Sequence, residues 1–163
     1  MSTAYLLIGG NLGNRSANLQ KAVFHIEQTC GKIVQSSAIY ETSAWGLTQQ
    51  PAFYNQALIL STSLSPEDLM RQLLAIETQM GRTREIKLGP RVIDLDILLI
   101  DQLVQHTQLL QLPHPALTMR RFALMPLAEI APDLLHPILQ KTIQSLLEIC
   151  PDQLDVQKLS TMA

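Results

Sequence analysis

Cysteine is scarce in this chain of 163 residues, and the scarcity excludes several kinds of site. Cys30 and Cys150 are the only two cysteines, they lie far apart, and neither has a His or Cys at the spacing of a metal-ligand set. The pattern therefore predicts no structural zinc site and no carrier of soft metals. It indicates reduced thiols in a reducing compartment.

A surplus of charge is also missing, because 12 Lys and Arg stand against 14 Asp and Glu, which gives a formal net charge of −2. This balance argues against a general nucleic-acid binder, and the basic residues gather in one loop instead of alternating with aromatic residues along strands. No basic segment precedes the first apolar run, and no apolar run approaches the roughly 18 residues of a membrane span. We therefore expect a monomeric, cytoplasmic protein without nucleic-acid or membrane partners.

Apolar content is what the chain has in quantity. Hydrophobic residues make up 47% and charged residues 16%, which is typical of a globular domain with a sizeable core. We expect residues 1–163 to form a single domain, with a poorly ordered tail over 151–163.

One segment, residues 81–96, runs four cations into two carboxylates that are spaced i, i+2. Asp94 and Asp96 run into the apolar stretch Ile97–Ile100, which predicts a strand, and side chains at i and i+2 of a strand share a face. Two oxygen ligands on one face favour Mg²⁺, which completes its shell with water and phosphate oxygens. Each half of this pattern, taken alone, is more typical of solvated charges, but together they predict a metal-bound polyphosphate. The cations are Arg82, Arg84, Lys87 and Arg91.

Apolar and β-branched stretches predict three strands before the one that begins near Asp94. The three are Ala4–Ile8, which Gly9-Gly10 should stop, then Ile33–Tyr40 and Phe53–Leu60. The stretch Glu41–Ala52 should be a loop.

Helical patterns separate these strands. Asn14 or Ser16 can cap a first helix, whose apolar positions Leu19, Val23 and Ile26 precede Gly31. A second helix should begin with Ser65 as its cap and Pro66 in its first turn. Its apolar stripe ends at Gly81 and consists of Leu69, Leu73, Ile76 and Met80.

The order strand, helix, strand, strand, helix, strand is that of the ferredoxin-like βαββαβ arrangement. We therefore expect an α+β fold with an antiparallel four-stranded sheet, two helices on one face, and the other face left for loops and ligand. A C-terminal hairpin, from 103–104 and 109–112, and two helices, Arg121–Ile130 and Thr142–Ile149, should follow.

Short motifs spread from Ala4 to about Pro132 go beyond these patterns. They are Ile8-Gly9-Gly10-Asn11-Leu12-Gly13, Tyr40-Glu41-Thr42, Phe53-Tyr54-Asn55, Ile76-Glu77, Gly81-Arg82, Gly89-Pro90-Arg91 with Asp94-Leu95-Asp96-Ile97, Pro113-His114-Pro115 and Arg120-Arg121-Phe122. Together they resemble the 6-hydroxymethyl-7,8-dihydropterin pyrophosphokinase family of folate biosynthesis. The resemblance implies transfer of a pyrophosphoryl group from ATP to the pterin's hydroxymethyl oxygen, with release of AMP.

For the nucleotide, the resemblance implies two Mg²⁺ ions on Asp94 and Asp96, with Arg82 and Arg91 as the further catalytic residues. The other implied ATP contacts are Glu77, Arg84, Lys87, Ile97, His114 and Arg120. Without the resemblance, a His between two prolines is more typical of a structural residue, and a helix glutamate of a solvated charge.

For the pterin, the resemblance implies a place between Phe53 and Phe122, since a flat heteroaromatic ring gains from stacking on both faces. Asn55 would pair with its donor and acceptor edge. The other implied contacts are Thr42, Ser43, Trp45 and Leu88. The turn over 9–13 is assigned to packing near the pterin, since no Gly-Lys-Ser/Thr follows it.

Three positions depart from the family pattern. Leu88 stands where a tryptophan often covers the pterin, Lys87 where an arginine is common, and Leu74 where a glutamine can hold adenine. The alternative function is a catalytically inactive nucleotide- or pterin-binding regulatory module on the same fold. The presence of Asp94 and Asp96 argues against it.

Overall fold

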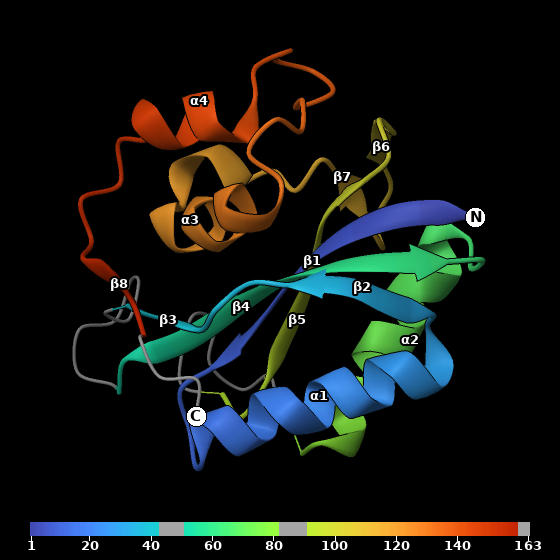
Figure 1. The fold of residues 1–163 in the computed structure, drawn as a ribbon. Coiled ribbons are helices and arrows are strands. Elements are labelled where there is room, and N and C mark those ends of the chain that lie inside the picture. Colours follow the sequence, from blue (N-terminus) through green and yellow to red (C-terminus); the bar gives the residue numbers. More distant parts are fainter. Residues whose placement is uncertain (43–50, 82–90, 160–163) are drawn as a thin grey trace.

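In the computed structural model, which describes residues 1–42, 51–81 and 91–159, one six-stranded antiparallel sheet lies between two layers of helices (Figure 1). The strands are β1 Ser2–Gly10, β2 Lys32–Ser36, β3 Tyr40–Thr42, β4 Phe53–Thr62, β5 Asp94–Ile100 and β8 Val156–Lys158. Their order is β5-β1-β4-β3-β8, with β2 also paired to β4.

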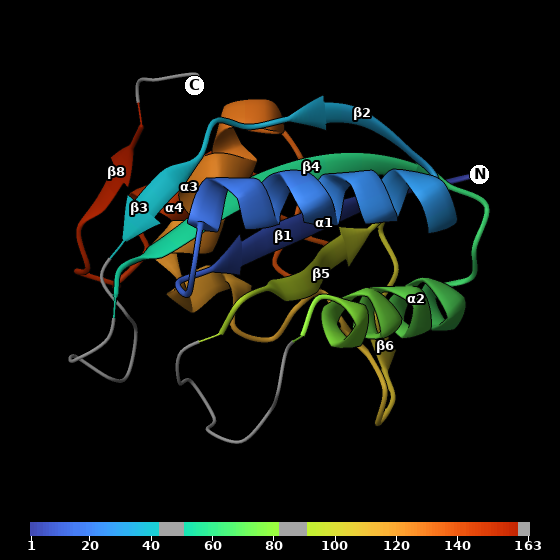
Figure 2. The same ribbon diagram turned by 90° about the horizontal axis from the view of Figure 1, so that it is seen from below.

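The helices are α1 Arg15–Thr29, α2 Pro66–Gln79, the short 3₁₀ helix Leu117–Met119, α3 Arg121–Ile130 and α4 Ile143–Glu148. Figure 2 shows α1 and α2 on one face of the sheet, and α3 and α4 pack on the other. Among the described residues, no helix is both long enough and apolar enough to span a membrane.

Local signals placed the first two helices correctly. The Asn14 side chain accepts a hydrogen bond from the Ala17 N–H at the start of α1, and Ser65 accepts one from the Asp68 N–H at the start of α2. The ferredoxin-like fold class is confirmed, although the sheet has six strands and not the four predicted, since two strands, β2 and β3, stand where one was expected and β8 adds a further strand.

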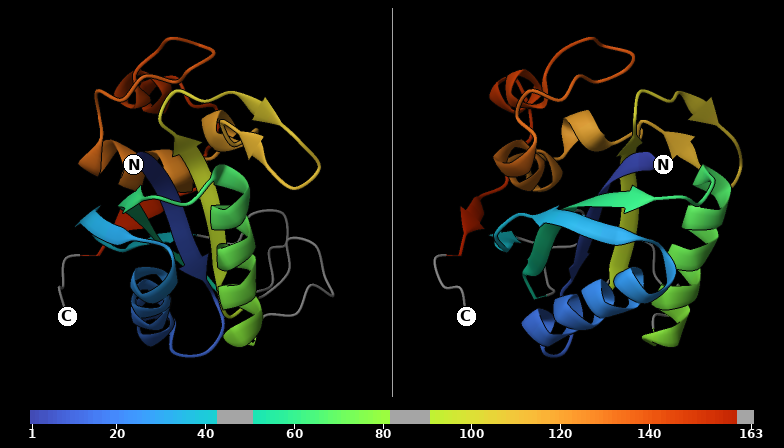
Figure 3. Two further views of the ribbon diagram at one scale, coloured as in Figure 1. Left: turned by 90° about the vertical axis from the view of Figure 1, so that its right-hand side faces the viewer. Right: turned by 45° about the vertical axis from the view of Figure 1, so that its right-hand side comes forward.

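The C-terminal hairpin is confirmed with a shifted first strand. It consists of β6 Gln105–His106 and β7 Gln111–Leu112, so the first strand begins two residues later than predicted. Figure 3 shows the hairpin beside the N-terminal end of α2, where the Gln105 side chain donates a hydrogen bond to Glu67.

The single strand predicted over Ile33–Tyr40 was wrong, because β2 ends at Ser36 and β3 begins at Tyr40. Ser37 Oγ accepts a hydrogen bond from Ala57 N and donates one to Ala38 O. Between the pairs Ser36–Leu58 and Tyr40–Asn55 the chain advances four residues on one side and three on the other. This extra residue is a bulge, and it separates the two strands.

The glycines after Ile8 extend β1 instead of ending it. Gly9 pairs with Asn55 on one side and Asp94 on the other. A side chain at Gly9 would collide with Asn55 and with the carbonyl of Tyr54, 2.7 Å away. The two glycines therefore let neighbouring backbone approach β1 closely, which is a tertiary requirement and not a stop signal.

The poorly ordered tail predicted after Pro151 was also wrong over 156–158. These residues form β8, which pairs antiparallel with β3, and Val156 is buried. The sheet face expected to be open is covered in part by α3 and α4, which pack on Leu7, Leu98 and Leu99.

Strand alternation divides the side chains of β1 and β5 between two cores. Leu6 and Leu95 face α1 and α2, whereas Leu7 and Leu98 face α3. Asp94 and Asp96 alternate with Leu95, so they lie on the α3 face, where this second core stops short of the end of β5.

Candidate active site

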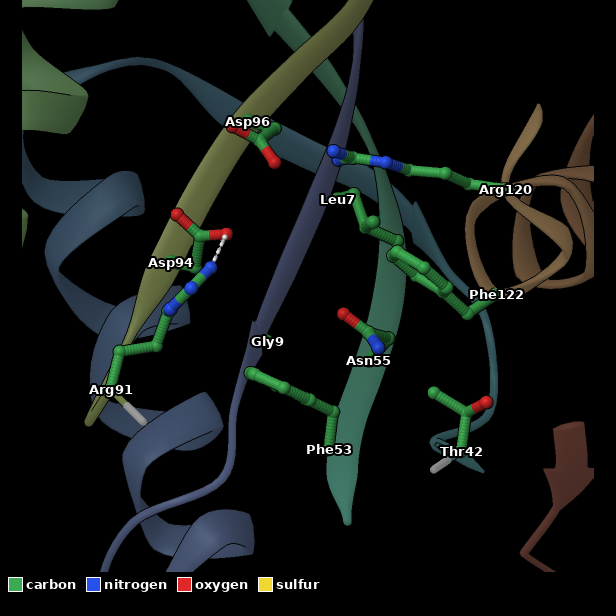
Figure 4. A pocket seen from close by; sticks show the side chains of 10 residues that line it. All are labelled: Leu7, Gly9, Thr42, Phe53, Asn55, Arg91, Asp94, Asp96, Arg120 and Phe122. Carbon is green, nitrogen blue, oxygen red and sulfur yellow. Dashed lines mark hydrogen bonds and ion pairs between the residues drawn. The ribbon is translucent and has the colours of Figure 1, made fainter. Parts of the chain in front are cut away.

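Two carboxylates stand at the start of β5. Asp94 is paired with Gly9 of β1, and Asp96 with Leu7. Both carboxylates point into one cavity, which Gly9 also lines (Figure 4). The sequence prediction that the two side chains share a face is therefore confirmed.

This first cavity brings together eight predicted site residues. Its lining consists of Leu7, Gly9, Thr42, Phe53, Asn55, Arg91, Asp94, Asp96, Arg120 and Phe122. In Figure 4 Asp94, Asp96 and Arg91 lie on the β5 side, Arg120 reaches towards them from the start of α3, and the rings and the amide lie on the β4 side. The cavity therefore has a charged end and an aromatic end.

At the aromatic end, the Asn55 side chain lies between the rings of Phe53 and Phe122 in Figure 4. Asn55 is 6% exposed and Thr42 is 3% exposed, so both are buried polar groups in the cavity wall. The Thr42 hydroxyl donates to Asp155 O at 2.9 Å. This end can receive a flat ring with a polar edge.

Asn11 fixes the position of Arg91. The Arg91 N–H donates to Asn11 Oδ1 at 2.9 Å, and the Asn11 and Leu12 N–H groups both donate to Arg91 O. Asn11 Nδ2 also donates to Pro51 O, which ties this turn to the start of β4. The motif 9–13 therefore does more than pack near a ligand, because it anchors the segment that leads into Asp94.

The Arg91 and Arg120 guanidinium groups lie at the charged end. Arg91 Nη1 is 3.2 Å from Asp94 Oδ2, and its guanidinium carbon lies 5.4 Å from the centre of the Phe53 ring. The guanidinium carbon of Arg120 lies 5.7 Å from the centre of the Phe122 ring, and its side chain extends towards Asp96. Each arginine can offer a planar set of donors to phosphate oxygens.

A second cavity lies on the other side of the two carboxylates. Its lining consists of Met70, Leu74, Glu77, Asp94, Leu95, Asp96, Ile97, Gln108, Leu109, Leu110, Gln111, His114 and Pro115. Asp94 and Asp96 are the residues that it shares with the first cavity. The carboxylates therefore lie at the junction of the two cavities.

Glu77 is only 2% exposed, so the reading as a solvated helix charge is wrong. Its Oε2 accepts a hydrogen bond from the Leu95 N–H at 2.7 Å. Leu95 stands between Asp94 and Asp96, so Glu77 also holds the strand that carries both carboxylates. Its predicted contact with the nucleotide stays a prediction.

His114 is held beside β5, because its backbone N–H donates a hydrogen bond to the Leu98 carbonyl oxygen at 2.9 Å. Its ring Nδ1 accepts from the Ala116 N–H at 3.1 Å, so in the neutral ring the proton sits on Nε2. Burial, and then the nearby charge of Arg120, lower the pKa of His114 to about 4. At neutral pH the side chain is thus an uncharged donor.

We expect the free protein to lose stability as pH falls from about 6.5 to about 4, partly through His114. Over that range the unfolded chain takes up a proton that the folded His114 resists, so protonation favours unfolding. Proton NMR should show the His114 ring signals, assigned with a His114→Gln variant, unchanged through pH 6.5 and shifting near pH 4. A midpoint near 6.5 would contradict the described burial.

Several predicted site residues lie outside the described residues: Ser43, Trp45, Arg82, Arg84, Lys87 and Leu88. Leu7 and the hairpin stretch 108–111 line the cavities but were missed. Leu7 could have been found from its i, i+2 relation to Gly9, whereas the hairpin carries no local signal of a site.

The donor set around the carboxylates fits a hard cation. Within 1–42, 51–81 and 91–159, no group of three or more His, Cys, Asp or Glu could hold a metal ion. Two carboxylates on one strand face suit Mg²⁺, which keeps several waters or phosphate oxygens in its shell, and do not suit a fully protein-bound metal.

Comparison with known proteins gave consistent matches. A model of the 7,8-dihydro-6-hydroxymethylpterin-pyrophosphokinase family matches residues 5–132. The 2-amino-4-hydroxy-6-hydroxymethyldihydropteridine pyrophosphokinase of Aquifex aeolicus is 41% identical over 144 residues, covering 88% of this chain and 89% of that protein. A protein with the same name from Methylorubrum extorquens is 45% identical over 135 residues, covering 82% and 85%.

Among solved structures, an HPPK-DHPS chain of Plasmodium falciparum, described with pteroate, superimposes with a TM-score of 0.75 at 16% identity. The match covers 90% of this chain and 42% of that one, so this chain spans less than half of it. At this identity the likeness shows the fold alone.

Proposed function

The chain belongs to the 7,8-dihydro-6-hydroxymethylpterin-pyrophosphokinase family, and we propose that its two cavities hold the two substrates of that reaction. The enzyme moves the pyrophosphoryl group of ATP to 6-hydroxymethyl-7,8-dihydropterin, giving the pterin diphosphate and AMP for folate biosynthesis. Both relatives carry the name of the enzyme, so nothing favours the inactive regulatory module.

The position of Asp94 and Asp96 in both cavities is the observation that carries this assignment. Transfer requires the pterin hydroxyl to meet the β-phosphorus of ATP. Two ligands bound on either side of these carboxylates would meet there, and positioning of this kind supplies a large part of the acceleration in phosphoryl transfer.

The first cavity suits the pterin. Phe53 and Phe122 can cover the ring, and the buried Asn55 can pair with its amide-like edge, because a carboxamide both donates and accepts hydrogen bonds. Thr42 completes the wall at that end. The hydroxymethyl group would then point towards the charged end, where Asp94 and Asp96 stand.

The second cavity suits the nucleotide. Met70, Leu74 and Ile97 give it an apolar wall against which a purine can pack. His114 offers its Nε2–H to a phosphate oxygen, and Arg91 and Arg120 lie at the shared end, where the triphosphate would cross towards the pterin.

Asp94 and Asp96 would hold Mg²⁺, for which we propose two ions. When bound, the metal neutralises charge on the phosphate oxygens. The residues Arg82, Arg84 and Lys87 are proposed as further ATP contacts, and Ser43, Trp45 and Leu88 as further pterin contacts. A monomeric state and a cytoplasmic location stay predictions of the sequence.

In the transfer, the pterin hydroxymethyl oxygen forms a bond to the β-phosphorus while the bond from that phosphorus to the α–β bridging oxygen breaks. AMP leaves with the bridging oxygen, and the proton of the hydroxyl passes to water. Arg91 and Arg120 lie where they can stabilise the charge that develops on the transferred oxygens.

The product nucleotide tests this function. We expect chromatography of a reaction with ATP, Mg²⁺ and 6-hydroxymethyl-7,8-dihydropterin to show AMP and a pterin diphosphate in equal amounts. ATP labelled at the γ-phosphate should pass its label to the pterin, because the β and γ phosphates move as one unit. Formation of ADP and a pterin monophosphate would instead identify an ordinary kinase.

A further inference from the structure

The segment 152–158, which follows α4, lies against the aromatic end of the first cavity. Its strand β8 pairs with β3, and the pair Thr42–Val156 stands beside the cavity. The Thr42 hydroxyl donates to Asp155 O, so the buried polar group of the cavity wall is satisfied by this segment. One wall therefore depends on residues near the end of the described chain.

The same segment contacts the start of α3. The Arg121 N–H, the first of that helix, donates to Asp152 Oδ2 at 3.0 Å, and the Leu154 N–H donates to Asp152 Oδ1 at 3.0 Å. The residue at the cap position, Arg120, makes no side-chain capping bond. Asp152 thus supplies from a distance the acceptor that the first turn of α3 lacks locally.

That first turn carries two residues of the cavity. Arg120 and Phe122 both line it, one on each side of the residue whose N–H Asp152 holds. Asp152 and Asp155 are three residues apart, so one short stretch fixes Phe122 on α3 and Thr42 on β3 at once. The stretch is itself anchored, because Val156 is buried and Lys158 Nζ lies 3.7 Å from Glu129 Oε1 of α3.

We propose that Asp152 is a positioning residue for the pterin, acting through the start of α3 on Phe122. This inference rests on the proposed function, since it takes the pterin as the ligand of the first cavity. A ring that is stacked on two sides is sensitive to the distance between its neighbours, so a small displacement of α3 weakens stacking. The nucleotide can be reached through Arg120, which precedes Arg121, but none of the residues that line the second cavity contacts Asp152 through a described hydrogen bond. The nucleotide should therefore be affected less than the pterin.

The test compares Asp152→Ala with Asp155→Ala, which removes the same charge from the same stretch. The Asp155 side chain accepts only from Gln157 Nε2 among the described hydrogen bonds, and its backbone carbonyl remains for Thr42. Ser65→Ala, which removes the cap of α2, serves as a control for lost stability at a distance from α3.

Calorimetry should measure pterin binding in the presence of Mg²⁺ and a non-hydrolysable ATP analogue, and binding of the analogue alone. We expect Asp152→Ala to raise the pterin Kd about three- to tenfold and to change the analogue Kd less. Asp155→Ala and Ser65→Ala should leave the pterin Kd within about twofold of the unaltered protein. Asp152→Asn, which keeps an oxygen acceptor, should recover part of the affinity.

An unchanged pterin Kd in Asp152→Ala, or an equal loss in Ser65→Ala, would overturn the positioning role while leaving the proposed function intact. If Asp152→Ala does not fold, Asp152→Asn and Asp155→Asn take its place. The first should bind pterin about two- to threefold more weakly than the second, because a charge at the helix N-terminus is lost. Absence of pterin binding by the unaltered protein would overturn the proposed function, and this inference with it.

Discussion

Replacing Asp94 or Asp96 by Asn should lower the turnover number by about a thousandfold or more while the fold is retained. Both carboxylates face the junction of the two cavities. Asn has nearly the same size but no charge, so it supports a divalent cation poorly and leaves the phosphate charge uncompensated. Formation of AMP at saturating Mg²⁺ and both substrates gives the measurement.

Asp101→Asn is the matched control, because it removes the same charge just beyond the other end of β5. Asp101 Oδ1 accepts from the Thr3 N–H, and an Asn oxygen can keep that bond. Turnover should stay near that of the unaltered protein. Near-normal turnover in both Asp94→Asn and Asp96→Asn would contradict the assignment of these two residues as Mg²⁺ ligands.

The sequence alone suggests that losing either carboxylate relieves repulsion in the metal-free protein. Asp94, however, is paired with Arg91 at 3.2 Å. Its removal therefore costs an ion pair as well, and any gain in thermal stability should be smaller for Asp94→Asn than repulsion alone implies.

Gly10→Ala should also have a large effect, and it should lower both the stability of the protein and its activity. A Cβ at Gly10 would overlap Val92 O and lie 2.9 Å from Val92 C, and both are backbone atoms that cannot rotate away. The segment that holds Arg91 and leads into Asp94 would have to move. We expect a loss of about 3 kcal/mol in the free energy of unfolding, measured in urea. The rate of AMP formation should fall at least to the fraction of the protein that remains folded.

Gly13→Ala separates this effect from the cost of the backbone conformation. Gly13 has φ +71°, and a Cβ there would approach only the Asn18 side chain, at 3.6 Å. The substitution should cost about 1 kcal/mol of stability and leave activity per folded molecule unchanged. If Gly10→Ala were no more harmful than Gly13→Ala, close approach of the backbone would not explain the glycine at position 10.

Local patterns predicted the elements that depend on neighbours in the sequence. The caps at Asn14 and Ser65 and the apolar stripe of α2 predicted the helices, because capping and periodicity act within a few residues. Strand alternation predicted that Asp94 and Asp96 share a face. The resemblance to a family added Phe53, Asn55 and Phe122, which no local pattern marks as a site.

Other features were decided only by residues far apart in the sequence. The predicted strand is interrupted where Ser37 bonds to Ala57. Gly10 extends β1 because it pairs with Tyr54 while Val92 lies close against it. Glu77 is buried because the strand that begins at Asp94 lies against α2. No periodicity in the chain encodes such pairings.

The arrangement of the two cavities is the last feature of this kind. The sequence by itself determined which side chains could bind a metal, a phosphate or a ring, since those properties belong to the residue types. Tertiary structure decided that Asp94 and Asp96 belong to both cavities and that 152–158 support the wall of the first through Thr42. The physical reason is that close approach and long-range pairing depend on the whole packed chain, whereas periodicity, capping and charge act locally.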